Sequence, residues 1–262
     1  MTQPWDEIVA GEPEEERVWE LFHENSKSHR LSGATDDAQV AAAMLRLWED
    51  LPYEGSDAVP LPGLALPPVP LGEALLARRT DTAFGTAPLS LAELSSLLTG
   101  GYGATERGSA VGRRRFRTVP SAGALYPLEL YVHVRAVTGL EPGLHHFQAA
   151  AGRLQRLGPL DDERLAGAFV QQDVVGAAAA VILMTAVFGR TTFKYGERGY
   201  RFALLEAGHV AQNVDLVASA LGLPAANLGG FFDRELEALL DLDGVEQSLL
   251  YAVAVGSSPT AE

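Results

Sequence analysis

The chain has 262 residues, of which 47% are hydrophobic and 21% are charged, so it has enough apolar side chains for one sizeable core. Its formal net charge of −14 argues against non-specific binding to nucleic acid or to an anionic membrane. The absence of cysteine excludes disulfides, iron–sulfur clusters, thiolate zinc sites and cysteine nucleophiles.

The N-terminal residues lack the basic start and the apolar run of a signal peptide. The longest apolar stretch, residues 177–188, is shorter than the roughly 20 residues that a membrane-spanning helix needs. We therefore expect a cytoplasmic protein without a membrane partner.

The first 50 residues predict a helical extension, because apolar residues group at 18–22 and again at 41–48. A stretch rich in proline follows at residues 51–70. Proline fixes φ and lacks an N–H, so this stretch predicts an extended connection and not a helix or an inner strand. The chain is thus expected to divide into an N-terminal helical extension with its Pro-rich connection, residues 1–70, and a main domain, residues 71–262.

Three helices are predicted in the main domain. The first covers residues 71–79. The second begins at Ser90, which has the spacing of a capping box with Glu93, and the glycines at positions 100, 101 and 103 are expected to end it. The third is a long helix over residues 197–221, where apolar residues recur at helical spacing and a glycine follows as a stop.

Five strands are predicted from β-branched and aromatic residues and from the turn signals between them. They cover residues 128–134, 144–147, 153–157, 181–188 and 249–255. Because helices and strands do not alternate regularly, we expect an α+β fold in which helices flank a central, mostly antiparallel sheet.

Several familiar motifs are incomplete. The glycines near position 100 do not form a dinucleotide-binding loop, because they follow a helix and the third glycine position is Glu106. Ser121 does not lie in a Gly-x-Ser-x-Gly elbow, which argues against a serine hydrolase. The six histidines lack metal-ligand spacing, so no metal site is expected. His209, inside the long helix, is expected in the core or at an interface.

The run Arg113-Arg114-Arg115-Phe116-Arg117 is unusual in so acidic a chain. Its first three arginines are consistent with a solvated basic loop. The alternative is an anion site for a cofactor phosphate or an acidic substrate segment. Arg117 is the better candidate for that role, because a tight loop follows it.

Four segments together suggest a site for a flat, phosphorylated ligand. Residues 117–129 place small residues between two prolines, which lets the backbone approach a ligand closely. Arg78-Arg79-Thr80 combines guanidinium groups with a hydroxyl, a combination that suits phosphate. Lys194-Tyr195 and Gly229-Gly230 follow later in the chain.

Eight segments also match a family pattern. They are Phe22 to Lys27, Leu89 to Leu98, Arg117 to Glu129, Pro142 to Phe147, Lys194 to Arg201, Glu206 to Asn213, Leu221 to Leu223 and Gly229 to Phe231. Through them the sequence resembles the SagB-type dehydrogenases, the azoline oxidases of the nitroreductase superfamily. The resemblance covers nearly the whole chain from residue 20.

The resemblance implies a nitroreductase-like fold, a homodimer with the long helix at its centre, and FMN as the cofactor. The cofactor-binding residues that it implies are Arg78, Arg79, Thr80, Arg117, Pro120, Ser121, Ala122, Gly123, Arg201, Gly229 and Gly230. Basic residues of the family pattern are missing at Thr82 and near the C-terminus, so Arg117, Arg190 or Arg201 would have to compensate.

The implied activity is FMN-dependent oxidation of thiazoline or oxazoline rings, in a ribosomal peptide or a carrier-bound natural product, to thiazoles or oxazoles. A complex with a cyclodehydratase is the implied partner. Lys194 and Tyr195 match the family's proton-transfer pair, and Arg198 and Arg201, if close, would favour the deprotonated form of either. Which of the two is the base stays open.

Two alternative functions stay open as well. One is an NAD(P)H-dependent flavin oxidoreductase that acts on a small molecule, as nitroreductases do. The other is a non-catalytic partner subunit of a peptide-modifying complex. The missing basic positions favour the second alternative, and the retained Lys194-Tyr195 favours azoline oxidation.

Overall fold

The computed structural model describes residues 18–28, 36–47, 49–53, 57–109 and 115–259. The expectations for residues 1–17, His29, Trp48, Arg113 and Arg114 lie outside the described residues. Within the described ranges, no helix combines the length and the apolar run needed to cross a membrane.

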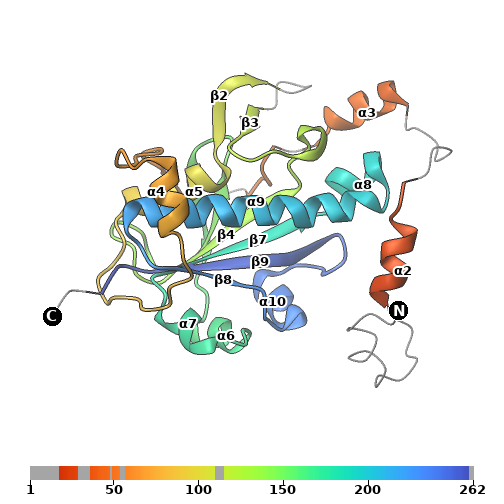
Figure 1. Cartoon of the computed structure of the whole chain (residues 1–262). Coiled ribbons are helices and arrows are strands. Elements are labelled where there is room, and N and C mark those ends of the chain that lie inside the picture. Colours follow the sequence, from red (N-terminus) through yellow and green to blue (C-terminus); the bar gives the residue numbers. More distant parts are fainter. Residues whose placement is uncertain (1–17, 29–35, 48, 54–56, 110–114, 260–262) are drawn as a thin grey trace, which may run out of the picture.

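The N-terminal extension forms two short helices, which confirms its predicted helical character. They are α2 (Val18–Asn25) and α3 (Asp37–Met44). Helix α2 buries none of its residues, whereas α3 packs Val40 and Met44 against Leu125 of the main domain. Figure 1 shows both helices at the end of the molecule that carries α8.

The Pro-rich connection is extended, as the sequence predicts, and its middle joins the main sheet. The strand β1 (Ala58–Pro60) pairs antiparallel with β6 (Arg153–Gly158) at the edge of that sheet. An edge strand tolerates proline because its outer side needs no hydrogen-bond donor.

The main sheet has seven strands with antiparallel pairing throughout, in the order β1-β6-β5-β4-β7-β9-β8. The strands not yet defined are β4 (Leu128–Val134), β5 (Gly143–Gln148), β7 (Ala180–Val187), β8 (Ala225–Leu228) and β9 (Gln247–Val255). The five predicted strands are confirmed, and β1 and β8 are additions. A separate two-stranded sheet consists of β2 (Ala104–Ser109) and β3 (Arg115–Arg117).

Helices cover both faces of the main sheet (Figure 1). One face carries α4 (Leu71–Ala77), α5 (Leu91–Tyr102), α8 (Gly189–Tyr195) and α9 (Arg198–Leu221). The other carries α6 (Asp162–Gly167), α7 (Gln172–Ala177) and α10 (Asp233–Leu240). The larger apolar core lies between the sheet and α5 with α9, and a smaller one lies under α6, α7 and α10. The α+β prediction is therefore confirmed, as is the Ser90–Glu93 capping box.

The expectation that Gly100 and Gly101 end helix α5 is wrong, because both lie in its last turn and Gly103 is the C-cap. Their role is in packing. A Cβ built on Gly100 would lie 2.6 Å from Val217 Cγ2, and one on Gly101 would lie 2.7 Å from Val214 Cγ2. The two glycines therefore let α5 approach α9 closely.

We expect Gly101→Ala to lower the free energy of unfolding by about 1–3 kcal/mol, because its methyl group meets Val214 across a close-packed helix pair. In a helix with free space, the same change gains up to about 1 kcal/mol of propensity. Gly176→Ala in α7 is the control, since its new Cβ would lie 4.0 Å from the Cβ of Ala166. Urea unfolding compares the two variants, and equal stabilities would contradict the packing argument.

Candidate active site

The loop between β3 and β4 holds an unusual backbone. Ala124 and Tyr126 have φ values of 52° and 48°, and Gly123 before them has a φ of 63°. A left-handed backbone costs a non-glycine residue about 1–3 kcal/mol, so surrounding contacts must hold this loop. One of these contacts is internal: Ser121 Oγ accepts a hydrogen bond from the N–H of Tyr126 at 2.9 Å.

Helix α8 brings the expected proton-transfer pair to this loop. Lys194 and Tyr195 occupy its last turn, and both are half-buried. A Cβ built on Gly123 would lie 2.7 Å from the Tyr195 hydroxyl and 3.0 Å from Lys194 Nζ. The polar ends of the pair thus meet the loop at a residue without a side chain. Lys194 Nζ also lies 5.2 Å from the centre of the Tyr195 ring.

A buried acid, Glu206 of α9, lies near the loop. It is 2% exposed, and the Tyr102 hydroxyl donates to its Oε1 at 2.7 Å. Burial raises the pKa of Glu206 to about 7, although hydrogen bonding lowers it. Sequence reasoning did not single out this residue as part of the site. The available signal was its position on the apolar stripe of α9, four residues after Phe202 and four before Val210.

Arg117 is buried nearby, and its charge is matched within the chain. Its Nη2 lies 3.2 Å from Asp50 Oδ1 and donates to the carbonyl of Glu49 at 2.7 Å. Asp50 also accepts hydrogen bonds from the backbone N–H groups of Ala149 and Ala150, at 3.1 and 2.9 Å. Arg117 therefore helps to fasten the N-terminal segment onto the main domain.

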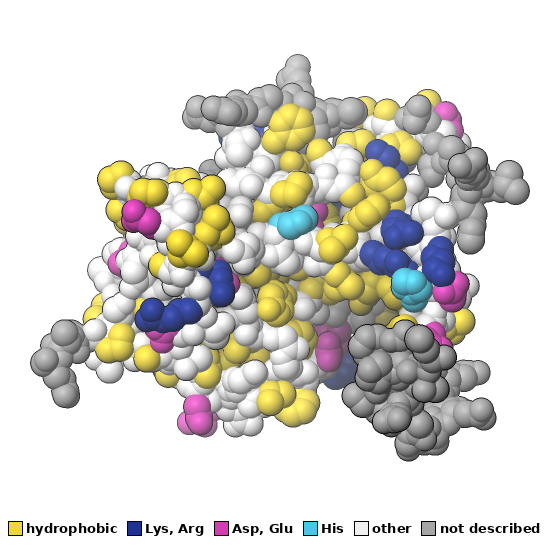
Figure 2. All heavy atoms as spheres, in the orientation of Figure 1, with side chains coloured by type: hydrophobic (Ala, Val, Ile, Leu, Met, Phe, Trp, Pro, Cys, Tyr) yellow, Lys and Arg dark blue, Asp and Glu magenta, His cyan; other side chains and the backbone are white. Residues whose placement is uncertain are grey.

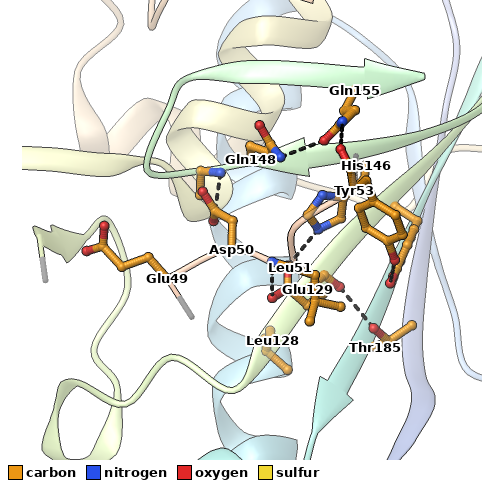
Figure 3. Close-up of polar contacts among 12 residues, drawn as sticks. Glu49, Asp50, Leu51, Tyr53, Leu128, Glu129, His146, Gln148, Gln155 and Thr185 are labelled. Atoms are coloured by element: carbon orange, nitrogen blue, oxygen red, sulfur yellow. Dashed lines mark hydrogen bonds and ion pairs between the residues drawn. The ribbon is translucent and has the colours of Figure 1, made fainter. Parts of the chain in front are cut away.

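A second buried network fastens α8 to the sheet. Glu129 of β4 is 1% exposed, with Arg190 Nη2 at 2.5 Å from one carboxylate oxygen and His146 Nε2 at 2.6 Å from the other. The N–H of Leu51 donates to the same carboxylate at 3.2 Å, and Figure 3 shows the contacts of Leu51 and His146. Burial opposes ionisation, but Arg190 and His146 outweigh it and hold the pKa of Glu129 below its ordinary value. Since Arg190 lies one turn before Lys194, this network positions the expected proton-transfer pair.

The expected phosphate-binding residues lie elsewhere, near Asp215 in the C-terminal half of α9. Arg78, the C-cap of α4, places Nη1 3.9 Å from Asp215 Oδ2, and Asn227 donates to the same oxygen at 2.7 Å. Asn227 Oδ1 is buried and has no hydrogen-bond partner among the described residues. Gly229-Gly230 follows β8 directly, and a Cβ on Gly229 would lie 3.3 Å from the ring of Tyr251.

A cavity of about 240 Å³ opens beside this group. Its lining includes Arg79, Asp81, Ser219 and Ser258. Arg79 Nη2 lies 3.0 Å from Asp81 Oδ2, and Thr80 between them is exposed. The acids offset part of the arginine charge, so the cavity is less cationic than the sequence pattern suggests.

The expected site residues thus fall into two groups on opposite sides of α9. The loop group, which is the loop of residues 120–123 with Lys194 and Tyr195, lies on the side of Glu206. The arginine group, which is Arg78 to Thr80 with Gly229-Gly230, lies on the side of Asp215. Their nine-residue spacing corresponds to a rise of about 14 Å and about half a turn around the helix. Arg201 joins neither group, because its Nε donates to Ser26 Oγ at 2.8 Å and its Nη2 to a carbonyl of α2 at 2.6 Å.

The histidines do not assemble into a site. Across the part of the chain that the structure describes, no three His, Asp or Glu side chains converge as metal ligands would. His209 is exposed on α9, so the expectation of a core position is wrong. An interface position for His209 stays a prediction.

Comparisons with known proteins show the family and the fold of the chain. A model of the nitroreductase family matches residues 75–257. The chain is 41% identical over 177 residues to MJ1384 of Methanocaldococcus jannaschii, whose name assigns it to the nitroreductases, over 66% of this chain and 85% of that protein. It is 28% identical over 162 residues to the microcin B17-processing protein McbC of Escherichia coli, over 59% of this chain and 57% of McbC. Its fold resembles a chain of the solved E. coli microcin synthetase McbBCD complex with truncated pro-MccB17 bound, with a TM-score of 0.62, 21% identity and 98% of both chains covered.

We expect Glu129→Gln to lower the free energy of unfolding at pH 7 by about 3–5 kcal/mol, because it leaves the buried Arg190 guanidinium without its counter-charge. The folded protein lowers the pKa of Glu129, so its carboxylate contributes stability above the ordinary pKa of 4.5 and loses that contribution as the pH falls through the lowered pKa. The effect of the substitution should therefore shrink in acid.

Urea unfolding at neutral and at acidic pH measures this difference. Glu235→Gln, which changes an exposed acid on α10, is the control and should alter stability by no more than about 0.5 kcal/mol. A Glu129→Gln effect as small as that of the control would show that the network does not stabilise the fold.

Proposed function

Because the chain belongs to the nitroreductase family, we propose that it is an FMN-dependent dehydrogenase that oxidises thiazoline or oxazoline rings of a ribosomal peptide or carrier-bound natural product to thiazoles or oxazoles. The observation that carries this proposal is the convergence of Lys194 and Tyr195 on Gly123. It places two groups that can move a proton beside a loop that a flat ring can approach. Similarity to McbC, named for microcin B17 processing, supports a peptide substrate.

The residues present fit FMN. Arg78-Arg79-Thr80 and the hydroxyl groups of the adjoining cavity would hold the phosphate. The side-chain-free backbone of Gly229-Gly230 would lie against the ring system. Two residues earlier, Asn227 Oδ1 has no hydrogen-bond partner among the described residues and would be an acceptor. Pro120-Ser121-Ala122-Gly123 would border the ring and the ribityl chain.

Arg117 and Arg201 are weaker candidates for the phosphate. The guanidinium group of Arg117 already binds Asp50, and that of Arg201 binds Ser26 and α2. The positive charge for a phosphate would therefore come chiefly from Arg78 and Arg79.

We further propose that a second copy of the chain completes the site. Figure 2 shows apolar side chains over α4 and along α9, where Leu76 is 90% and Leu205 is 60% exposed. A two-fold axis perpendicular to α9 that pairs α9 with α9 places the N-terminal half of one helix beside the C-terminal half of the other. That arrangement brings the loop group of one copy toward the arginine group of its partner, which one copy alone keeps on opposite sides of α9.

Oxidation of an azoline to an azole removes a proton and a hydride from adjacent ring carbons. A bound FMN would supply the hydride acceptor. The chain supplies the base, either Lys194 Nζ or Tyr195 Oη, which takes the proton from the ring carbon. The Arg190–Glu129 ion pair fixes the helix that carries both groups, so their distance from the loop is set before substrate binds.

One observation favours a second function. Identity to MJ1384 exceeds identity to McbC, so an NAD(P)H-dependent flavin oxidoreductase acting on a small molecule is the alternative. A non-catalytic partner subunit is favoured by the missing basic positions and by Asp81 and Asp215, which offset the nearby arginine charge. For the peptide-modifying function, a complex with a cyclodehydratase is the proposed partner, and similarity to a chain of the microcin synthetase complex supports it.

Lys194→Ala should slow oxidation of a synthetic thiazoline peptide by about 100-fold or more, because it removes one of two candidate bases. The flavin absorbance should be retained. Lys27→Ala, which changes the other lysine of the chain, is the matched control and should keep the wild-type rate, since Lys27 lies on the surface beside Glu24.

Full oxidation by a yellow Lys194→Ala variant would remove Lys194 from the proton step and leave Tyr195. Rapid anaerobic bleaching of the flavin by NADPH, without bleaching by the thiazoline peptide, would establish the reductase instead. A chain that stays colourless with added FMN would reject both enzymes and leave the partner subunit.

Leu205→Glu should convert the proposed dimer to a monomer, because it places charge in an apolar helix contact. Val245→Glu is the control, since Val245 is 70% exposed on the loop between α10 and β9. Size-exclusion chromatography with light scattering gives both masses. A wild-type protein that runs as a monomer would exclude the two-copy site.

A further inference from the structure

Arg115 belongs to the basic run of the sequence and has no role in the proposed function. It opens β3 and its side chain is exposed. Arg117, two residues later, is buried and paired with Asp50, whereas Arg115 forms no ion pair with a described residue. The positive charge of Arg115 is therefore available to another molecule.

Arg115 borders a cleft between the N-terminal segment and the turn of the β5–β6 hairpin. The volume of the cleft is about 510 Å³, within the range of roughly 300–1,000 Å³ that is usual for ligand sites. One wall is the segment from Glu49 to Tyr53, and the other lies in the hairpin turn between Gln148 and Arg153. Figure 3 shows the N-terminal segment running beside Gln148.

The hydrogen-bond donors that remain in this cleft are cationic. Arg153 is exposed like Arg115, and it too forms no ion pair with a described residue. Arg115 Nη2 donates to the carbonyl of Ala150, and Arg153 Nε donates to Gln148 Oε1. Because a guanidinium group has five N–H donors, both arginines keep donors for a ligand.

The two acids that line the cleft already have partners in the chain. Asp50 binds Arg117 and accepts two backbone hydrogen bonds from the hairpin turn. Glu49 Oε1 accepts a hydrogen bond from the N–H of Arg115 at 3.0 Å. Both acids thus help to hold the walls together, and the cleft offers a ligand chiefly its two guanidinium groups.

The hollow continues on either side of Arg115. A second cavity of about 260 Å³ shares Arg115 and the hairpin turn with the cleft and extends to Thr99 of α5. A smaller hollow beside Arg115 reaches Arg117 and Tyr126, in the loop before β4. A row of adjoining hollows suits an extended chain, whereas a single phosphate group would leave most of this space empty.

Size and charge together indicate an acidic peptide. Guanidinium groups bind carboxylates through two parallel hydrogen bonds. The whole chain carries a net charge of −14, so it repels an acidic peptide over most of its surface. Binding of such a peptide therefore needs a local site with unpaired arginines, which this cleft provides.

We infer that the cleft between Arg115 and Arg153 binds an acidic segment of a peptide, whose carboxylates pair with the two guanidinium groups. The role of that segment rests on the proposed function: it holds the substrate peptide beside the loop that meets Lys194 and Tyr195. Binding itself needs neither FMN nor turnover.

The test is fluorescence anisotropy of a rhodamine-labelled hexaglutamate peptide, titrated at low salt with the full chain without added FMN. Arg115→Gln and Arg153→Gln should each weaken binding by about tenfold, because each removes a charge-assisted contact. Arg164→Gln is the matched control, since it removes an exposed arginine from α6 on the other face of the sheet and should leave binding unchanged. A hexaglutamine peptide should not bind.

Equal weakening by all three variants would reveal a general charge effect and overturn the inference, as would the absence of hexaglutamate binding. Arg153→Gln covers the case in which Arg115→Gln disturbs β3, because Arg153 lies on β6. Displacement of the peptide by FMN would assign the arginines to the cofactor and also overturn the inference. A chain that binds the peptide but stays colourless with FMN would support the cleft and reject the proposed flavin enzyme.

Discussion

The candidate site depends on the ion pair between Arg190 and Glu129. Helix α8 has seven residues, too few to persist by helix propensity alone, so its position comes from tertiary contacts. Each partner of the pair is almost fully buried and would be costly to leave without the other. The ion pair therefore fixes the position of α8 on the sheet, and the position of α8 fixes that of Lys194. Leu51 binds the same carboxylate, which brings the N-terminal extension into this constraint.

Local sequence patterns predict those helices and strands whose limits are set by residues close in the sequence. The capping box at Ser90 and the limits of β4 follow from neighbouring residues. Helix α8 escapes prediction because it opens with glycine and contains two adjacent threonines, which disfavour a helix, and because a distant strand anchors it. Strand β8 contains no β-branched or aromatic residue. The family resemblance points to Gly123 and Lys194, but no local pattern shows that Glu206 of α9 meets Tyr102 of α5.

Two buried glutamates of this site respond to pH with opposite signs. Glu129 has its pKa lowered, so it stabilises the fold when ionised. Glu206 has its pKa raised from 4.5 to about 7, so its contribution to stability falls as the pH rises between these values. The difference lies in their partners, a guanidinium and an imidazole for Glu129 and the Tyr102 hydroxyl for Glu206. The residue type alone does not give the direction of the pKa shift, because that direction depends on the groups that the fold brings next to each carboxyl group.

The Asp50 contact has a consequence for synthesis of the chain. Asp50 accepts hydrogen bonds from the backbone of Ala149 and Ala150, and the latter lies 100 residues further on. A ribosome adds roughly 5–20 residues per second, so the segment around Asp50 is made several seconds before the hairpin that receives it. The segment around Asp50 therefore cannot dock until the β5–β6 hairpin that receives it has been made.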